Sequence, residues 1–170
     1  ETIGIVGPNG AGKSTLAWLL MRFADPSSGR ILIDDTDIRT VSLASLRAQI
    51  GLVPQHTLLL NASVRDNIAY GAPEAGEKAI HAVARAARAD DFIEQLPDGY
   101  DTLIGDQGIR LSGGQWQRLS LARTLLKDPP SIILDEAPSM FDPQGEKEFL
   151  AECAQLLAGR TVIMITHRPV

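Results

Sequence analysis

A chain of 170 residues, 44% hydrophobic and 22% charged, is long enough to bury a core and has the composition of a globular domain. Its formal net charge of −5, without a long run of lysine or arginine, argues against a protein that binds nucleic acid by neutralising phosphates. The single cysteine, Cys153, excludes an intrachain disulfide and a multi-cysteine zinc site, and we expect it to be a small apolar residue on a helix face.

Nothing in the sequence resembles a secretory signal, a targeting tail or a transmembrane segment, because the longest apolar runs have only the length of a strand. Glu1 leads almost directly into an apolar strand, and Val170 follows a strand with no closing element. We therefore expect the chain to be a portion of a longer polypeptide, truncated at both ends.

The first third of the sequence alternates apolar strands with helices. Thr2–Val6 is expected to form a short buried strand that runs into a glycine-rich loop. The following segments are predicted as a helix from Lys13 to about Arg22, a strand over Arg30–Asp34, a short helix over Leu43–Gln49 and a strand over Ile50–Val53.

The middle of the chain has a different character. Ser63–Ala69 indicates one or two helical turns, and Asp90–Leu96 indicates a further helix before a turn. Glu77–Ala89 is rich in alanine and places Ile80, Val83, Ala84 and Ala87 on one helical face. No strong strand is evident before the loop at Gly105–Gly108, so we predict a mainly helical subdomain over about residues 55–108.

After Ser112, helices and strands alternate again. We predict a helix to about Lys127, a buried strand over Ser131–Leu134, a helix over Pro143–Leu157 and a last buried strand over Thr161–Ile165. Apolar strands that alternate with helices favour a mainly parallel sheet flanked by helices on both faces. The predicted fold class is therefore α/β, with one domain whose core comprises residues 1–54 and 109–170.

The sequence GPNGAGKST at residues 7–15 lies directly after the first predicted strand and before the first helix. It satisfies G-x-x-x-x-G-K-[ST], in which glycines let backbone N–H groups turn toward phosphate oxygens at a helix N-terminus. Lys13 supplies a positive charge for the β- and γ-phosphates, and the Ser14 hydroxyl group can bind Mg²⁺. The predicted nucleotide-binding residues are Gly7, Pro8, Asn9, Gly10, Ala11, Gly12, Lys13, Ser14 and Thr15.

Two carboxylates follow the strand SIIL at residues 131–134. The C-terminal ends of parallel strands are where an open α/β sheet binds its ligands. Asp135 is a candidate Mg²⁺ ligand, directly or through water, whereas Glu136 points elsewhere and could polarise an attacking water. For this strand taken alone, an alternative is that Asp135 is a turn residue and Glu136 a solvated charge.

The stretch RLSGGQWQR at residues 110–118 predicts a helix start that contains two glycines. Ser112 and Gln115 have the spacing of a capping box. A cap needs neither Gly113 nor Gly114, each of which costs a helix about 1 kcal/mol relative to alanine. Bare backbone amides are required, however, where a helix start approaches a γ-phosphate closely.

Taken together, these motifs resemble those of an ATP-binding-cassette (ABC) ATPase domain, and the resemblance covers essentially the whole chain. GPNGAGKST resembles the Walker A motif, SIILDE resembles the Walker B motif with its catalytic glutamate, and LSGGQ matches the family signature letter for letter. Gln55 falls at the Q-loop position, SMFD at residues 139–142 resembles the D-loop, and His167 falls at the switch histidine. The resemblance implies a P-loop NTPase core with an inserted helical subdomain.

The resemblance also implies roles for these residues in the hydrolysis of ATP with Mg²⁺. Glu136 would be the general base, Gln55 would sense the γ-phosphate and the metal, and His167 would contact the γ-phosphate and orient Glu136 or the water. The implied catalytic residues are Lys13, Gln55, Glu136 and His167, and the implied metal site comprises Ser14, Gln55 and Asp135.

The signature is implied to serve the nucleotide of a partner domain, in a head-to-tail dimer that holds two ATP molecules at its interface. The residues implied to act in trans are Leu111, Ser112, Gly113, Gly114, Gln115 and Asp142. Ser42–Gly71 resembles exporter-type transporters, although Leu103 stands where many exporters have glutamate. The implied partners are a second ABC ATPase domain and a transmembrane domain at the cytoplasmic face of a membrane, with no nucleic acid.

Two alternatives come from other classes. A non-transport ABC ATPase could act on DNA or ribosomes, but the DNA-acting type carries a long coiled coil, for which Gln55–Leu111 is too short and lacks heptads. A P-loop module that transfers phosphate to a small acceptor has no use for LSGGQ. An ATPase activity that responds to a membrane-embedded partner, and not to DNA or ribosomes, would discriminate among them.

Overall fold

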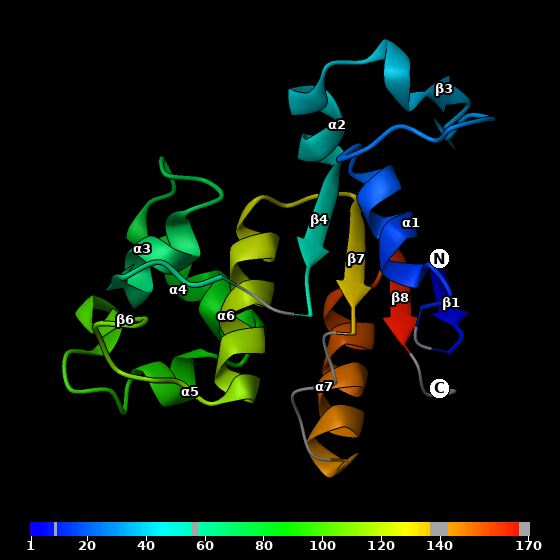
Figure 1. Cartoon of the computed structure of the whole chain (residues 1–170). Helices are drawn as coiled ribbons and strands as arrows, with labels where there is room; N and C mark the ends of the chain where they lie inside the picture. Colours follow the sequence, from blue (N-terminus) through cyan, green and yellow to red (C-terminus); the bar gives the residue numbers. More distant parts are fainter. Residues whose placement is uncertain (9, 56–57, 137–142, 167–170) are drawn as a thin grey trace.

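The computed structural model of the chain, which describes residues 1–8, 10–55, 58–136 and 143–166, contains a parallel sheet with helices on both faces (Figure 1). The sheet has four strands in the order β1-β8-β7-β4, and all three pairings are parallel. The strands are β1 (Thr2–Val6), β8 (Thr161–Thr166), β7 (Ser131–Asp135) and β4 (Ile50–Val53). The predicted α/β class with a parallel sheet is confirmed.

The helices follow the predicted order. They are α1 (Lys13–Leu20), α2 (Leu43–Gln49), α3 (Val64–Ala69), α4 (Glu77–Ala86), α5 (Asp90–Ile93), α6 (Gly113–Leu126) and α7 (Pro143–Leu156). Helices α1 and α4 end before their predicted limits, because Arg22 and Arg88 adopt positive φ angles of 52° and 50° that do not continue a helix. Helix α5 ends at Ile93 and not at the predicted Leu96, because Gln95 and Leu96 donate to the carbonyl oxygens three residues before them, as in a tighter turn. Among the described residues, no helix has both the length and the apolar character needed to cross a bilayer.

Short strands lie outside the main sheet. The predicted strand over Arg30–Asp34 is reduced to β2 (Leu32–Ile33), because Asp34 and Asp35 turn the chain at φ angles of 47° and 62° into β3 (Thr36–Asp37). The segment predicted to lack strands contains a pair of antiparallel two-residue strands, β5 (Ala62–Ser63) and β6 (Leu103–Ile104). Strands of two residues are too short to show an alternating pattern in the sequence.

Both faces of the sheet are covered at β7, as its apolar run requires. The prediction that Thr2–Val6 is a buried strand is wrong, because β1 lies at the edge of the sheet and four of its five residues are exposed. Ile132 and Leu134 of β7 face a large core cluster that includes Phe149 and Cys153 of α7, whereas Ile133 faces a smaller cluster with Ala17 of α1. Cys153 is the predicted buried residue on a helix face, and its burial raises the pKa of its thiol to about 12.

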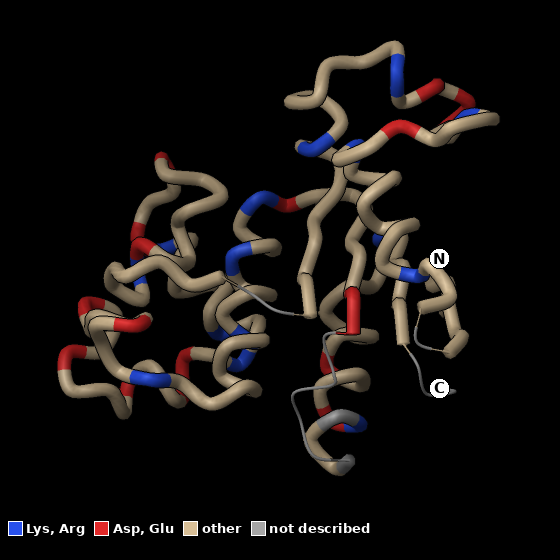
Figure 2. Tube along the Cα trace, in the orientation of Figure 1, with Lys and Arg blue, Asp and Glu red and all other residues tan. Residues whose placement is uncertain are grey.

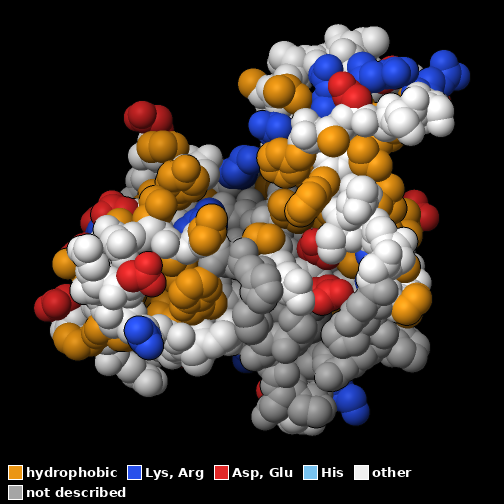
Figure 3. All heavy atoms as spheres, viewed as in Figure 1, with side chains coloured by type: hydrophobic (Ala, Val, Ile, Leu, Met, Phe, Trp, Pro, Cys, Tyr) orange, Lys and Arg blue, Asp and Glu red, His pale blue; other side chains and the backbone are white. Residues whose placement is uncertain are grey.

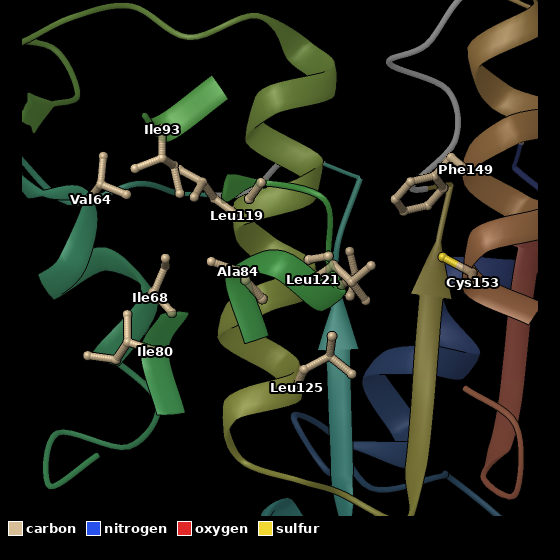
Figure 4. Close-up of a cluster of buried hydrophobic side chains, with 14 of the residues drawn as sticks. Val64, Ile68, Ile80, Ala84, Ile93, Leu119, Leu121, Leu125, Phe149 and Cys153 are labelled. Atoms are coloured by element: carbon tan, nitrogen blue, oxygen red, sulfur yellow. The ribbon is translucent and has the colours of Figure 1, made fainter. Parts of the chain in front are cut away.

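Helix α6 is buried on more than one side. It packs against α3 and α4 on one side and β4 on the other, and Figure 4 shows Leu119 and Leu121 extending from it into the large core cluster. The approach of α6 to β4 depends on Gly51, because a Cβ at this position would overlap Cγ2 of Thr124 and lie 2.8 Å from Cγ of Pro129. Helix α6 therefore joins the helical segment of the fold to the edge of the sheet.

Candidate nucleotide-binding site

Two glycines of the loop between β1 and α1 adopt a left-handed backbone. Gly10 and Gly12 adopt φ angles of 80° and 89°, a region that residues with a side chain rarely occupy. Gly12 is the N-cap of α1, and no side chain caps the first N–H groups of this helix. These N–H groups and the N-terminal end of the helix dipole together favour an anion at this position.

The Lys13 side chain folds back over this loop. Its Nζ donates hydrogen bonds to the carbonyl oxygens of Gly7 (2.8 Å) and Pro8 (3.0 Å), and the residue is only 8% exposed. The ammonium group is therefore held beside the loop amides, where its charge adds to their attraction for phosphate oxygens.

Ser14 and Asp135 meet across the end of the sheet, as predicted. The Ser14 hydroxyl group donates to Oδ1 of Asp135 at 3.2 Å. Burial raises the pKa of the Asp135 carboxyl group and the charge of Glu136 adds to the rise, while the hydrogen bond from Ser14 and the charge of Lys13 oppose it. A buried carboxylate beside a hydroxyl group is a pair of hard oxygen ligands that a divalent cation would stabilise.

The described residues contain no group of three or more histidine, cysteine or acidic side chains that could enclose a metal ion. Ser14 and Asp135, with the predicted third ligand Gln55 in the same cavity as Ser14, would thus bind a metal only together with waters and phosphate oxygens. That is the usual environment of Mg²⁺ in nucleotide sites, and the residues present fit this ion.

Glu136 follows β7 in a strained conformation and contacts Gln55. Its φ angle is 48°, and its backbone N–H donates to the carbonyl oxygen of Ile165 at 2.9 Å, which extends the pairing of β7 with β8 by one residue. Gln55 Nε2 donates to Glu136 Oε2 at 2.6 Å. The strained backbone thus turns the carboxylate out of the regular alternation of the strand and toward the segment that follows β4. Figure 2 shows acidic residues at this end of β7.

One cavity of about 380 Å³ joins the predicted residues of three separate segments. It is lined by Gly10, Gly12, Lys13, Ser14, Thr15, Gln55 and Glu136. The predicted residues Asn9, Asp142 and His167 lie outside the described part of the structure. In this structure the Gln55 amide contacts Glu136, and it lines the same cavity as Ser14.

The signature segment lies apart from this cavity. The predicted capping box is confirmed, since Ser112 Oγ accepts from Gln115 N–H at 3.2 Å and Gln115 Oε1 accepts from Ser112 N–H at 2.8 Å. Ser112, Gly113, Gly114 and Gln115 line a second hollow of about 580 Å³, which shares no residue with the first. Leu111 packs against the large core cluster.

Gln117 was not among the residues that the sequence indicated. This residue is 1% exposed, and its Nε2 donates to the carbonyl oxygens of Pro54 (3.4 Å) and Gln55 (3.1 Å). Gln117, Ser120 and Thr124 are spaced along one face of α6 and are all buried, although a polar face of this kind indicates exposure to solvent in a sequence. The sequence feature that could have indicated Gln117 is its position two residues after the LSGGQ motif.

The chain is similar to known proteins in both sequence and structure. A family model described as "ABC transporter" matches residues 1–139. The chain is 54% identical over 168 residues to an ATP-dependent lipid A-core flippase of Syntrophus aciditrophicus, and 49% identical over 166 residues to an ATM1-type heavy metal exporter of Novosphingobium aromaticivorans. It covers 28% and 27% of these relatives, which cover 99% and 98% of the chain.

A solved structure, described as a bacterial Atm1-family ABC exporter with ATP bound, matches the fold with a TM-score of 0.90. The two are 49% identical, and the match covers 98% of this chain and 29% of the other. The chain therefore spans between a quarter and a third of the length of these similar proteins.

Proposed function

The chain belongs to the ABC transporter family, as an ATPase domain of the exporter type, and we propose that it binds and hydrolyses ATP with Mg²⁺ to drive transport across a membrane. The observation that carries this proposal is the single cavity in which the phosphate-binding loop, Gln55 and Glu136 meet. The relatives are a flippase and exporters, which favours transport over the alternative of a non-transport ATPase acting on DNA or ribosomes.

Phosphoryl transfer depends mainly on positioning and on stabilising negative charge. Lys13 and the loop amides would hold the β- and γ-phosphates, and Ser14, Gln55 and Asp135 would hold Mg²⁺. When bound, this ion neutralises the charge that develops on the phosphate oxygens. The Glu136 carboxylate, oriented by its hydrogen bond from Gln55, accepts the proton of the attacking water.

The separation of the two cavities supports a head-to-tail dimer. The signature residues 112–115 line a hollow that is separate from the first cavity, and Gly113 and Gly114 lie at the N-terminus of α6. A phosphate bound there would come from the nucleotide of a second ABC ATPase domain, and it would meet backbone amides without obstruction by side chains. In this proposal Asp142 also acts in trans, and His167 contacts the γ-phosphate of its own site.

A transmembrane domain is the second proposed partner. Leu58, three residues after Gln55, is 85% exposed, and two further large apolar side chains are exposed: Tyr70 (62%) at the end of α3 and Phe23 (58%) after α1. Figure 3 shows hydrophobic side chains on both sides of the hollow between the helical segment and the sheet. Arg123 lies over the Tyr70 ring and Arg47 over the Phe23 ring, so cations border this surface. We place it against the membrane domain, at the cytoplasmic face of the membrane.

The division of the chain follows from the same proposal. Residues 1–54 and 109–170 form the ATP-binding core, and about residues 55–108 form the helical subdomain that begins at Gln55. Helices α3 and α4 of this subdomain pack on α6, so the signature at the start of α6 lies between the two parts.

Glu136→Gln tests the assignment of the general base in the full-length protein that carries this chain, reconstituted in lipid nanodiscs. Gln keeps the shape of the side chain but is a far weaker base, so ATP turnover should fall at least about a hundredfold. ATP binding, measured with a fluorescent analogue, should be retained. Steady hydrolysis by this variant would remove Glu136 from the role.

A second substitution tests the dimer. Glu136→Gln should accumulate with two ATP molecules held at a closed interface, because the bound nucleotide is not consumed. Adding Ser112→Arg places a long side chain at the signature and should abolish ATP-driven association of the two domains, measured by cross-linking or spin-label distances, while ATP binding persists. Normal association of the double variant would contradict the head-to-tail arrangement.

A further inference from the structure

Gln117 connects two parts of the structure that the proposed function assigns to different ATP molecules. It lies on α6, one turn beyond the glycines that face the nucleotide of the partner domain. Its Nε2 donates to the carbonyl oxygens of Pro54 and Gln55, which belong to the segment that carries Gln55 into the chain's own nucleotide cavity. One side chain thus bridges from the signature helix to the other site.

The helix that carries Gln117 is closely packed against its surroundings. Leu119, Leu121 and Ala122 are buried in the large core cluster, and the Thr124 hydroxyl group donates to the carbonyl oxygen of Leu52 in β4. A close-packed interior transmits displacements and does not absorb them. A shift at the start of α6 is therefore passed to the backbone at Pro54 and Gln55 through the Gln117 carboxamide.

The hydrogen bonds continue from Gln55 to the general base. The backbone of Gln55 is held by Gln117, and its side-chain Nε2 donates to Glu136 Oε2 at 2.6 Å. A change in the position of the Gln55 backbone would change the orientation of the Glu136 carboxylate toward the attacking water. Two hydrogen bonds, joined by the covalent structure of Gln55, thus link Gln117 on α6 to the carboxylate of Glu136.

The glutamine at this position stabilises the fold in one respect, since it donates to the carbonyl oxygens of Pro54 and Gln55, and destabilises it in another. Within the described residues, Gln117 Oε1 is buried and has no hydrogen-bond partner. A buried acceptor without a partner destabilises a fold, whereas a methionine of similar size would leave no such atom. The donor function of Nε2 is the feature that a methionine lacks.

From these contacts we propose that Gln117 is a positioning residue that couples the signature helix to the Gln55–Glu136 pair, so that nucleotide contact at one ATP site adjusts the general base of the other. This inference rests on the proposed ATPase function and on the head-to-tail dimer. It adds a route by which the two ATP sites influence each other.

The test is Gln117→Met in the full-length protein in nanodiscs, with ATP hydrolysis measured over a range of ATP concentrations. We expect kcat to fall about tenfold, because the loss of a hydrogen bond to the Gln55 backbone misplaces the base in the transition state. KM for ATP should change less than twofold, since the contacts of the phosphate-binding loop remain. The Hill coefficient for ATP should fall toward 1.

A double-mutant cycle with Gln55→Ala shows whether Gln117 acts through Gln55. In the Gln55→Ala background, Gln117→Met should lower kcat less than twofold further. Thr102→Val is the control, because it removes a buried hydrogen bond, donated by the Asp98 backbone N–H to Thr102 Oγ1, that involves neither α6 nor β4, and it should keep the wild-type kcat and Hill coefficient within twofold.

Three results would overturn the inference: a wild-type kcat in Gln117→Met, an unchanged Hill coefficient, or an equally large loss of kcat in the Gln55→Ala background. Gln117→Leu, which also removes both N–H donors and introduces no charge, carries the same test if the methionine variant does not fold. Failure of the proposed function gives a different result, since the wild-type protein would then not hydrolyse ATP at all.

Discussion

Gly51→Ala is expected to loosen the contact between β4 and α6. The added methyl group would overlap Cγ2 of Thr124 and lie 2.8 Å from Cγ of Pro129 and 3.5 Å from Cγ1 of Ile132. Thr124 cannot rotate away without loss, because its hydroxyl group donates to the carbonyl oxygens of Leu52 (3.2 Å) and Ser120 (2.9 Å). The strand must therefore move away from the helix.

The magnitude follows from these contacts. Overpacking a core by one methyl group costs about 1–3 kcal/mol, and two close neighbours at Gly51 place the cost in the upper part of that range. Replacing glycine by alanine lowers the entropy of the unfolded chain and returns about 0.4–1 kcal/mol. The expected net loss is about 1–2 kcal/mol in the free energy of opening the β4–α6 contact.

Thr124→Ser provides the matched partner for Gly51→Ala. It removes Cγ2 but keeps the hydroxyl group, and alone it should cost about 1 kcal/mol for the lost methyl group. In the double variant the methyl group added at position 51 occupies the space that Cγ2 leaves. The two changes should therefore cost about 1 kcal/mol less together than the sum of the single costs.

Hydrogen exchange measured by mass spectrometry on peptides that cover Ile50–Val53 and α6 gives the local opening free energies in the intact protein. ATP turnover should fall in parallel, since β4 leads directly to Gln55. Unchanged exchange in Gly51→Ala, or additive effects in the double variant, would refute the packing argument.

Two further predictions concern Lys13 and Cys153. Lys13→Ala should raise the Kd for ATP about tenfold or more, because it removes charge-assisted hydrogen bonds to phosphate. Lys78→Ala, on the exposed face of α4, is the control and should leave the Kd unchanged. Equal ATP affinities of the two variants, measured by calorimetry, would contradict the role of Lys13. Because burial raises the pKa of the Cys153 thiol to about 12, iodoacetamide at pH 8.5 should label the folded protein far more slowly than the urea-unfolded protein. Above the ordinary thiol pKa of 9.0 the unfolded chain loses this proton and the folded chain keeps it, so the free energy of unfolding should decrease as pH rises. Rapid labelling of the folded protein, or stability that is constant from pH 8 to 10, would show that the thiol is not enclosed.

The strands and the phosphate-binding loop were predictable because their signals are local. Each strand of the sheet is a short apolar run, and Lys13, Ser14 and Asp135 occupy fixed places relative to strand ends. The meeting of Ser14 with Asp135 followed from the rule that parallel strands present their carboxyl ends at one edge. The family resemblance supplied Gln55, whose contact with Glu136 the structure shows.

The buried polar face of α6 was not predictable from hydropathy. Gln117 and Thr124 are polar, yet they face carbonyl groups at β4 and beyond it, where a buried acceptor needs a donor. The short strands β5 and β6 gave no periodic signal, and no pattern in the sequence indicates the left-handed backbone of Glu136. These features depend on contacts between segments far apart in the chain.

If Glu136 is the general base, as we propose, its left-handed backbone means that the residue which catalyses hydrolysis also carries backbone strain. Glycine and asparagine adopt this conformation more readily than glutamate, so either replacement would relax the backbone while removing the base. In the proposed mechanism, either replacement would exchange hydrolysis at this site for a relaxed backbone. A dimer with one active and one inactive site could arise by such a substitution and keep both of its nucleotides bound.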